Sequence, residues 1–501
     1  MLNNLVESNV GSNRDAIKAD LLEKIVYDDP VVFKRLRVDQ VDSNFVATCA
    51  ASFKTANTED IDILVKLAEQ ASKKTSDALE DEENQDKAND SKKEERSGNH
   101  GAAEEKKMYD PLVCNTLCNL FFLSSDSSLQ VRLFSYIANF DQATTRKFQK
   151  TNGMLKADEP HTFGFPSCSP DLTISMHGID ASTSKLWRDR DAFGEVKPSN
   201  KQGPKPATPG AIPPIVTQSA DYARLFMSAR PFMLFCVGIL IFGTEFCVGI
   251  YDRDGVTFSP VFDMFEDTDT LIRVVRTLGC HLSVEELGFD PTVRLLSDLE
   301  TQKLTGNTKY PSAVVSSCGN DPRQWCTIGP PIWASLSLLG RGTNVWRVRE
   351  YVVNGNEDPY LQGKEMIMKT AWRSSARISE SDIYLSIDQP PEGLAKFECG
   401  GDVWSAGYPI TVQNLRGKAV YDLDIDPPTP VLHRLVLGTI GRPLWEYTSD
   451  LDLLSGFRAA LQGESLLIIS CDHLSPPFSS PGPLRSKHTS PGHKSRECYA
   501  N

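Results

Sequence analysis

The residues with the clearest chemical potential in this sequence lie in "FGEVKPS", residues 193–199. Glu195 and Lys197 are two positions apart in a run that otherwise has the composition of a buried strand. In a strand, side chains two apart point to the same face and lie about 6.5 to 7 Å from each other. This acid and this base are therefore expected to reach into one shared space.

A second acid is expected to join them. Asp171 follows Pro170, opens the apolar stretch "DLTISM" and precedes Glu195 by 24 positions, which allows two antiparallel strands to lie side by side. Two neighbouring carboxylates repel each other unless a cation lies between them, and Mg²⁺ is commonly held by one or two carboxylates and several waters. A lysine beside such a metal can orient or deprotonate a water for attack on a phosphodiester.

These residues resemble the motif of the PD-(D/E)XK nuclease superfamily, with Pro170-Asp171 followed by Glu195-Val196-Lys197. Gln218 and Tyr222 are four apart, hence on one helical face, and resemble the Gln-x-x-x-Tyr signature of its RecB-like branch. The resemblance covers about 160–260 and implies a restriction-endonuclease-like core, Mg²⁺ at Asp171 and Glu195, and DNA as a partner. The acid that the superfamily often carries in its first helix is not identified. Taken singly, an E-x-K pair is also common on a solvated strand face, and Pro-Asp is common in turns.

A second set of candidate residues lies about 150 positions further on. "LLGRGTNVWRV" predicts a strand, a turn at Gly340 and Gly342, and another strand, and glycine lets a backbone approach nucleotide phosphates closely. Lys369 lies in the apolar stretch "EMIMKTAW", where an unpaired ammonium is costly to bury. It needs a partner, which can be ATP phosphates, Glu380 on the following segment, or both.

This part of the chain is similar to the fungal-type protein kinase family. Four segments carry the likeness: "YDRDGVTFSPVFD" (251–263), "LLGRGT" (338–343), "MKTAWRSS" (368–375) and "RLVLGTIGRPLWEYTSDLDLLSGFRAALQG" (434–463). The likeness runs from about 108 to 463 and implies ATP-dependent phosphotransfer to Ser or Thr. It also implies that Lys369 contacts ATP, that Glu380 is its helix partner, that Gly340 and Gly342 cover the phosphates, and that "VLGTIGRPLWEY" is the hinge.

The sequence departs from this family after "GFRAALQG". No His-Arg-Asp catalytic loop and no Asp-Phe-Gly turn follows, and His433-Arg434 is succeeded by Leu435 in the expected hinge strand. Kinases need the first Asp to position the acceptor hydroxyl and the second to hold Mg²⁺. We therefore expect a truncated, pseudokinase-like region; a shifted reading frame or a retained intron would give the same Ser/Pro-rich ending. The alternatives are a metal-dependent nuclease and a non-catalytic module that binds unidentified proteins.

The predicted architecture is α+β: a restriction-endonuclease-like α/β core, then a kinase-like N-lobe and hinge. The expected parts are a helical region at 1–71, a charged disordered linker at 72–107, the nuclease-like module at 108–300, a linker at 301–325, the kinase-like part at 326–463 and a disordered tail at 464–501. The apolar segment 231–251 is long enough to cross a bilayer, but Glu245 and the Gly243-Thr244 break favour a hairpin of two buried strands.

Composition sets the remaining limits. The chain has 53 basic and 66 acidic residues, a net charge of -13 and a pI near 5.2, so nucleic acid or an anionic membrane would require a local basic patch. It has 12 cysteines and no secretory signal at "MLNNLVESNV". These features favour reduced thiols in an intracellular protein, cytoplasmic or nuclear, without a membrane anchor.

Overall fold

The computed structural model describes residues 10–73, 127–441 and 447–459, with gaps at 152, 157–161, 163–164, 177–183, 308–309, 317, 356, 389, 391–393, 418–422 and 424–425. By its internal contacts the chain divides into two units. The larger unit comprises Met1–Asp382 and Ala395–Gly441, and the smaller comprises Ile383–Leu394 and Arg442–Asn501. The predicted linker at 72–107, apart from its first two residues, and the predicted tail at 464–501 lie outside the described residues.

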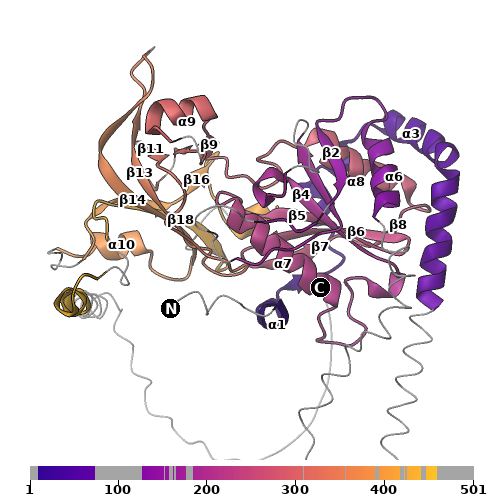
Figure 1. Cartoon of the computed structure of the whole chain (residues 1–501), viewed down its shortest axis with the longest axis horizontal. Coiled ribbons are helices and arrows are strands. Elements are labelled where there is room, and N and C mark those ends of the chain that lie inside the picture. The colour runs from indigo at the N-terminus through magenta and orange to yellow at the C-terminus, as the bar shows by residue number, and fades with distance from the viewer. Residues whose placement is uncertain are drawn as a thin grey trace, which may run out of the picture. The chain divides into compact units, whose positions relative to one another are not determined.

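The first sheet of the larger unit has eight strands in the order β1-β7-β6-β5-β4-β3-β2, with β8 paired to β6 (Figure 1). The strands are β1 (Ile25–Val26), β2 (Arg146–Lys150), β3 (Leu172–Met176), β4 (Ala192–Lys197), β5 (Cys236–Phe242), β6 (Glu245–Asp252), β7 (Gly255–Phe258) and β8 (Phe262–Asp263). Strand β4 is antiparallel to β3 and parallel to β5. Strands β3 and β4, helix α7, and strands β5 and β6 follow one another in this order along the chain.

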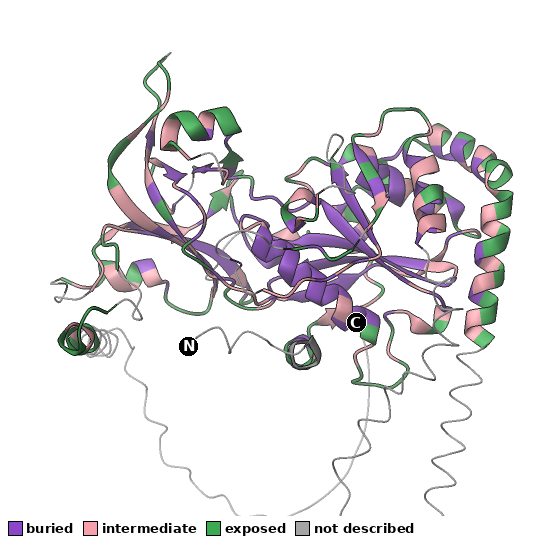
Figure 2. Cartoon of the chain, in the orientation of Figure 1, coloured by how far each residue is buried: buried purple, intermediate pink, exposed green. Residues whose placement is uncertain are grey.

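Helix α7 (Pro214–Ala229) makes the connection that the parallel pair β4 and β5 requires. It begins with Pro214, which costs little at a first helical position because the missing N–H has no partner there. Nearly all of its side chains are buried, and Figure 2 shows α7 and the central strands coloured mainly as buried. This burial fixes α7 firmly against β4, which carries Glu195, and against β5.

The apolar segment 231–251 forms two strands, as predicted. β5 and β6 pair antiparallel from Cys236–Tyr251 to Phe242–Glu245 around a two-residue turn. Gly243 has a φ of +63°, and a Cβ there would meet the Asn200 side chain, so the turn requires glycine. None of the helices in the described ranges has the length and apolar composition of a membrane span.

The N-terminal part contains α1 (Val10–Leu21), α2 (Val31–Arg35), α3 (Ser43–Ala56) and a helix over 58–73. The two-residue strand β1 was not predicted; it lies parallel to β7 and joins this region to the first sheet. A two-residue strand is too short to give a periodic signal in the sequence.

The second sheet also has eight strands, in the order β15-β18-β14-β13-β11-β10-β9 with β12 on β13, and its strand pairs are antiparallel. The strands are β9 (Val293–Leu295), β10 (Ala313–Val315), β11 (Gln324–Thr327), β12 (Trp333–Ala334), β13 (Asn344–Val352), β14 (Tyr360–Ser374), β15 (Phe397–Asp402) and β18 (Pro430–Leu437). Three short helices, α9 (Asp298–Thr305), α10 (Glu380–Leu385) and α11 (Val412–Leu415), and the hairpin of β16 (Trp404–Ser405) and β17 (Tyr408–Pro409) complete it.

The segment predicted as a linker, 301–325, contains regular secondary structure. It contains most of α9, all of β10 and the beginning of β11. The sheet therefore begins at Val293, before the expected boundary at 300. Strand β10 has only three residues, and so short an apolar run cannot be recognised from periodicity.

The two sheets share a hydrophobic core. Trp346 and Met368, on β13 and β14, belong to the same buried cluster as Tyr222 and Phe226 of α7. The Trp346 ring stacks on Phe232, with centroids 4.7 Å apart and planes 5° from parallel. One face of the second sheet therefore packs against the first sheet.

Candidate functional site

Five predicted residues converge on one cluster, which we call the Asp171–Glu195 cluster; they lie just before β3, in β4 and in α7. Lys197 Nζ donates to Glu195 Oε1 at 2.6 Å and to Gln218 Oε1 at 3.0 Å. Gln218 Nε2 lies 2.6 Å from the Tyr222 hydroxyl, which lies 3.1 Å from Glu195 Oε2. Asp171 Oδ2 accepts the Val196 N–H at 2.8 Å. The spacing of two in β4 and of four in α7 thus places these side chains together.

Burial raises the pKa of both carboxyl groups of the cluster. Burial, and then the negative charge of Asp171, raises the pKa of Glu195 to about 7, against the opposing pull of Lys197. Burial also raises the pKa of Asp171, and the two carboxyl groups are hydrogen-bonded. The arrangement can hold a proton between two acids near neutral pH, and a cation in the same place would let both acids ionise.

The cluster offers a divalent cation two carboxylates and no third one. In the described ranges there is no group of three His, Cys, Asp or Glu side chains with metal-binding geometry. Helix α6 (Ser128–Ala138), which precedes β2 in the chain, carries Gln130, an amide, whose buried Oε1 has no hydrogen-bond partner among the described residues. Ser127, just before α6, donates to the Asp171 carbonyl at 3.0 Å. The start of α6 therefore does not supply the helix acid that the nuclease superfamily often carries.

The second predicted set also comes together. Lys369 Nζ on β14 donates to both carboxylate oxygens of Glu380, at 2.8 and 2.6 Å. The two side chains are 25% and 32% exposed, so the ion pair remains open to a ligand. Arg341 lies 3.4 Å from the same carboxylate. Two cations thus share one acid, which leaves one positive charge without a counter-charge among these three residues.

The Gly-x-Gly turn before β13 has the backbone conformation that its glycines predict. Gly340 and Gly342 have φ values of +82° and +46°. A Cβ at Gly340 would meet no atom within 4 Å, whereas one at Gly342 would lie 2.4 Å from the guanidinium carbon of Arg253. Gly340 therefore faces open space, and Gly342 allows the turn to lie close to Arg253.

The register of β13 and β14 decides which residues face the Lys369–Glu380 pair. Val345 is opposite Lys369, and Trp346 is opposite Met368. Because neighbouring positions in a strand point to opposite faces, Val345 and Ile367 share the face of Lys369, while Trp346 points into the core. The glycine-rich loop of protein kinases has a third glycine near the position of Trp346. The place of Trp346 in the core accounts for the large residue found there.

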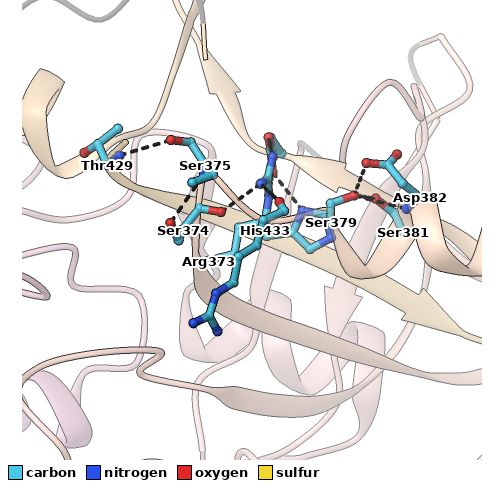
Figure 3. Close-up of polar contacts among 11 residues, drawn as sticks. Arg373, Ser374, Ser375, Ser379, Ser381, Asp382, Thr429 and His433 are labelled. Atoms are coloured by element: carbon cyan, nitrogen blue, oxygen red, sulfur yellow. Dashed lines mark hydrogen bonds and ion pairs between the residues drawn. The ribbon is translucent and has the colours of Figure 1, made fainter. Parts of the chain in front are cut away.

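The position of Glu380 depends on a helix cap that the sequence analysis missed. Ser379 Oγ accepts the Asp382 N–H at 3.1 Å and lies 2.6 Å from Asp382 Oδ2, as Figure 3 shows. This interaction begins α10 and makes Glu380 its first residue. The signal was present in the sequence as Ser-x-x-Asp before an apolar residue.

The end of β14 is fixed by a second group of polar contacts. The Thr429 N–H donates to Ser375 Oγ at 3.0 Å (Figure 3). Arg373 forms an ion pair with Asp402, which also contacts His433 Nδ1 at 2.9 Å. Four basic residues line a cavity of about 400 Å³ beside Gly340: Lys24, Arg253, Arg341 and Arg373. Lys369 does not line this cavity, which is a separate feature of the same turn.

A fold with an open lysine–glutamate pair beside a glycine turn defines a kinase-like protein. A family model described as fungal protein kinase matches residues 174–475, more than half of the 501 residues. The chain therefore belongs to the fungal protein kinase family. The match includes both candidate sites except Asp171, which precedes it. No curated protein and no solved structure matches the chain. The resemblance to PD-(D/E)XK nucleases stays a prediction.

Proposed function

We propose that the second sheet binds ATP at the Lys369–Glu380 pair, as a nucleotide-binding module of the kinase type. The observation that carries the proposal is the open ion pair: Lys369 is held by both oxygens of Glu380 yet remains a quarter exposed. A lysine in this position contacts nucleotide phosphates in kinases, where its ion pair with a helix glutamate fixes its direction.

The surroundings of the pair suit the parts of a nucleotide. Val345 and Ile367 are half-buried apolar residues on the same face and can contact a base. Gly340 leaves room for phosphates, and Arg341 adds a second cation at the turn. Phosphates placed here would neutralise the positive charge that Glu380 alone does not balance.

The proposal is limited to binding. Phosphotransfer needs an acid to position the acceptor hydroxyl and another to hold Mg²⁺. Residues 1–501 contain no His-Arg-Asp sequence, and among the described residues no three-membered acidic or His/Cys group can hold a metal. We therefore expect ATP to bind with or without Mg²⁺ and to remain intact.

Calorimetric titration of the full chain with ATP, in EDTA and in Mg²⁺, tests the proposal. Lys369→Met should weaken binding at least tenfold, about 1.4 kcal/mol. The matched control is Lys364→Met, because Lys364 is an exposed lysine of the same strand that donates to the Gly438 carbonyl and not to a carboxylate of the described residues. Equal affinities in all three proteins would refute an ATP site at Lys369.

A second function is favoured by the Asp171–Glu195 cluster. We propose that it is a metal-dependent site for phosphodiester cleavage in DNA, with Asp171 and Glu195 as ligands of Mg²⁺ and Lys197 beside the metal. Burial and then the charge of Asp171 raise the pKa of Glu195, and a divalent cation between the two acids would let both ionise. When bound, the metal would supply Lewis-acid activation of a water. Lys197, held by Gln218, would orient that water.

The nuclease proposal needs its own experiment. The full chain and Glu195→Ala are incubated with single- and double-stranded DNA and Mg²⁺ or Mn²⁺. Glu285→Ala, a change at an exposed acid, is the control. Cleavage that is lost only in Glu195→Ala supports the site. If the natural chain and Glu195→Ala are equally inactive, the cluster is a structural ion-pair network.

A further inference from the structure

Two buried thiols that belong to neither candidate site meet in the second sheet. Cys318 follows β10 and Cys399 lies in β15, 81 residues apart, and their sulfur atoms are 3.8 Å from each other. Cys318 is fully buried and Cys399 is 8% exposed. A disulfide needs sulfurs about 2.05 Å apart, so the present contact is that of a reduced pair.

The pair joins opposite ends of the second sheet. Along the path β15-β18-β14-β13-β11-β10-β9, strand β15 is the first and β10 is the second from the end. The contact of Cys318 with Cys399 therefore means that this sheet curves until its ends meet. A covalent bond here would close the curved sheet across a gap that no backbone pairing among the described strands covers.

The backbones beside the two cysteines are already in contact. Gly319 has a φ of +62°, and a Cβ there would lie 2.6 Å from the Gly400 carbonyl oxygen. A Cβ at Gly401 would lie 2.7 Å from the Gly319 Cα. Strand β15 also has an irregularity in register between Phe397 and Cys399, which gives the chain local freedom to adjust. The sulfurs can therefore approach without moving distant parts of the sheet.

Charged groups around the sulfurs set the reactivity. The hydrogen bond with Cys318, burial and the neighbouring Asp321 all raise the pKa of the Cys399 thiol. Arg323 is a cation near these sulfurs, and it forms ion pairs with Asp321 and Glu398. Thiol–disulfide exchange proceeds through the thiolate, so a raised pKa makes oxidation slow at neutral pH and faster in alkali.

We propose that Cys318 and Cys399 form a reversible dithiol/disulfide site whose oxidant is a low-molecular-weight disulfide such as oxidised glutathione. One thiolate attacks a glutathione sulfur, which forms a mixed disulfide and releases one glutathione thiolate. The second thiolate attacks the protein-bound sulfur, which forms the Cys318–Cys399 bond and releases the second. The protein loses two electrons and two protons, and one oxidised glutathione becomes two reduced molecules.

The test uses the full chain with Cys114, Cys118, Cys471 and Cys498 changed to serine. The folded protein is incubated with oxidised glutathione at pH 7 and pH 8.5, quenched in acid, alkylated and analysed by peptide mass spectrometry. We expect one cross-linked peptide pair, which contains Cys318 and Cys399. The cross-link should form faster at the higher pH, and dithiothreitol should remove it. The cross-link should raise Tm by about 5 °C, because it closes an 81-residue loop.

Two variants make the result specific. Asp321→Asn removes the negative charge beside Cys399 and should speed oxidation at least threefold at pH 7, whereas Cys399→Ser should abolish both the cross-link and the Tm rise. Cys280 is the most accessible of the described cysteines and serves as an internal control. If Cys280 is fully glutathionylated while Cys318 and Cys399 remain thiols or join other cysteines, the proposal is wrong.

Discussion

Glu195 has a buried carboxyl group that belongs to a candidate site and makes the stability of the fold depend on pH. It is 2% exposed, faces another acid and is held by Lys197 and Tyr222. The raised pKa means that the folded state keeps the Glu195 proton up to about pH 7, while the unfolded chain releases it near 4.5. Stability from this group is therefore complete at low pH and is lost as the pH rises between these values.

Replacing this carboxyl group should flatten the pH dependence of stability. Across pH 5 to 8 the free energy of unfolding of the natural chain should fall by a component on the order of 3 kcal/mol, and Glu195→Gln should lack it. Urea unfolding at several pH values measures this, with Glu285→Gln as the exposed control. Equal pH slopes for the natural chain and Glu195→Gln would mean that Glu195 is ionised throughout.

At the scale of elements, α10 is a short helix whose first residue supplies the acid for Lys369. Ser379→Ala removes its cap and should cost about 1 kcal/mol of local stability. Glu380 would then be held less firmly, so ATP affinity should fall several-fold although no residue of the ion pair has changed. Calorimetry compares it with Ser386→Ala, which alters a hydroxyl beyond the helix. If Ser379→Ala and Ser386→Ala bind ATP with identical affinities, the helix cap does not influence the ATP site.

The glycine turn offers a matched pair of substitutions. Gly340→Ala and Gly342→Ala both place alanine at a positive φ, which costs on the order of 1 kcal/mol each. Gly342→Ala must in addition displace Arg253, which donates to the Ser337 carbonyl at 2.6 Å. Thermal unfolding should show the larger loss for Gly342→Ala. A larger loss for Gly340→Ala would contradict the packing of this turn on Arg253.

The sequence predicted local geometry well because spacing determines which side chains share a face. The pairs at two positions in β4 and at four positions in α7, and the hairpin of β5 and β6, follow from such short-range rules. Contacts such as Arg416 with Asp252, 164 residues apart, follow from tertiary packing and leave no local signal. For the same reason β1 and β10 were missed, and the boundary between the sheets was placed too late.

At the scale of the whole molecule, buried ion pairs join the two sheets. Arg416 beyond α11 forms two hydrogen bonds of 2.7 Å with Asp252, a fully buried residue of β6. Removing one partner of a buried pair leaves an unbalanced charge. Arg416→Ala should therefore lower the free energy of unfolding by about 3 kcal/mol. The exposed pair Arg294–Glu300 is the control, and Arg294→Ala should cost below about 1 kcal/mol. Urea unfolding measures the loss of stability in both variants. If Arg416→Ala and Arg294→Ala lose similarly small amounts, the packing of the two sheets does not depend on the contact of Arg416 with Asp252.

The part of the smaller unit that the structure describes includes a helix over 450–459 with three exposed apolar residues. Leu451, Leu454 and Phe457 are 74%, 63% and 47% exposed. In the sequence this segment directly follows the expected hinge. Its apolar face is a feature of that unit by itself and is not needed for the ATP proposal.

Labelling by an acyl-phosphate derivative of ATP tests the central claim most directly. In this reagent a lysine near the bound phosphates attacks the acyl carbonyl and releases ATP, so mass spectrometry identifies the lysine that lies there. We predict that Lys369 is acylated in the full chain, that free ATP prevents this, and that Lys364 and Lys197 are not protected. Absence of ATP-protected labelling at Lys369, with the protein folded, would contradict the account.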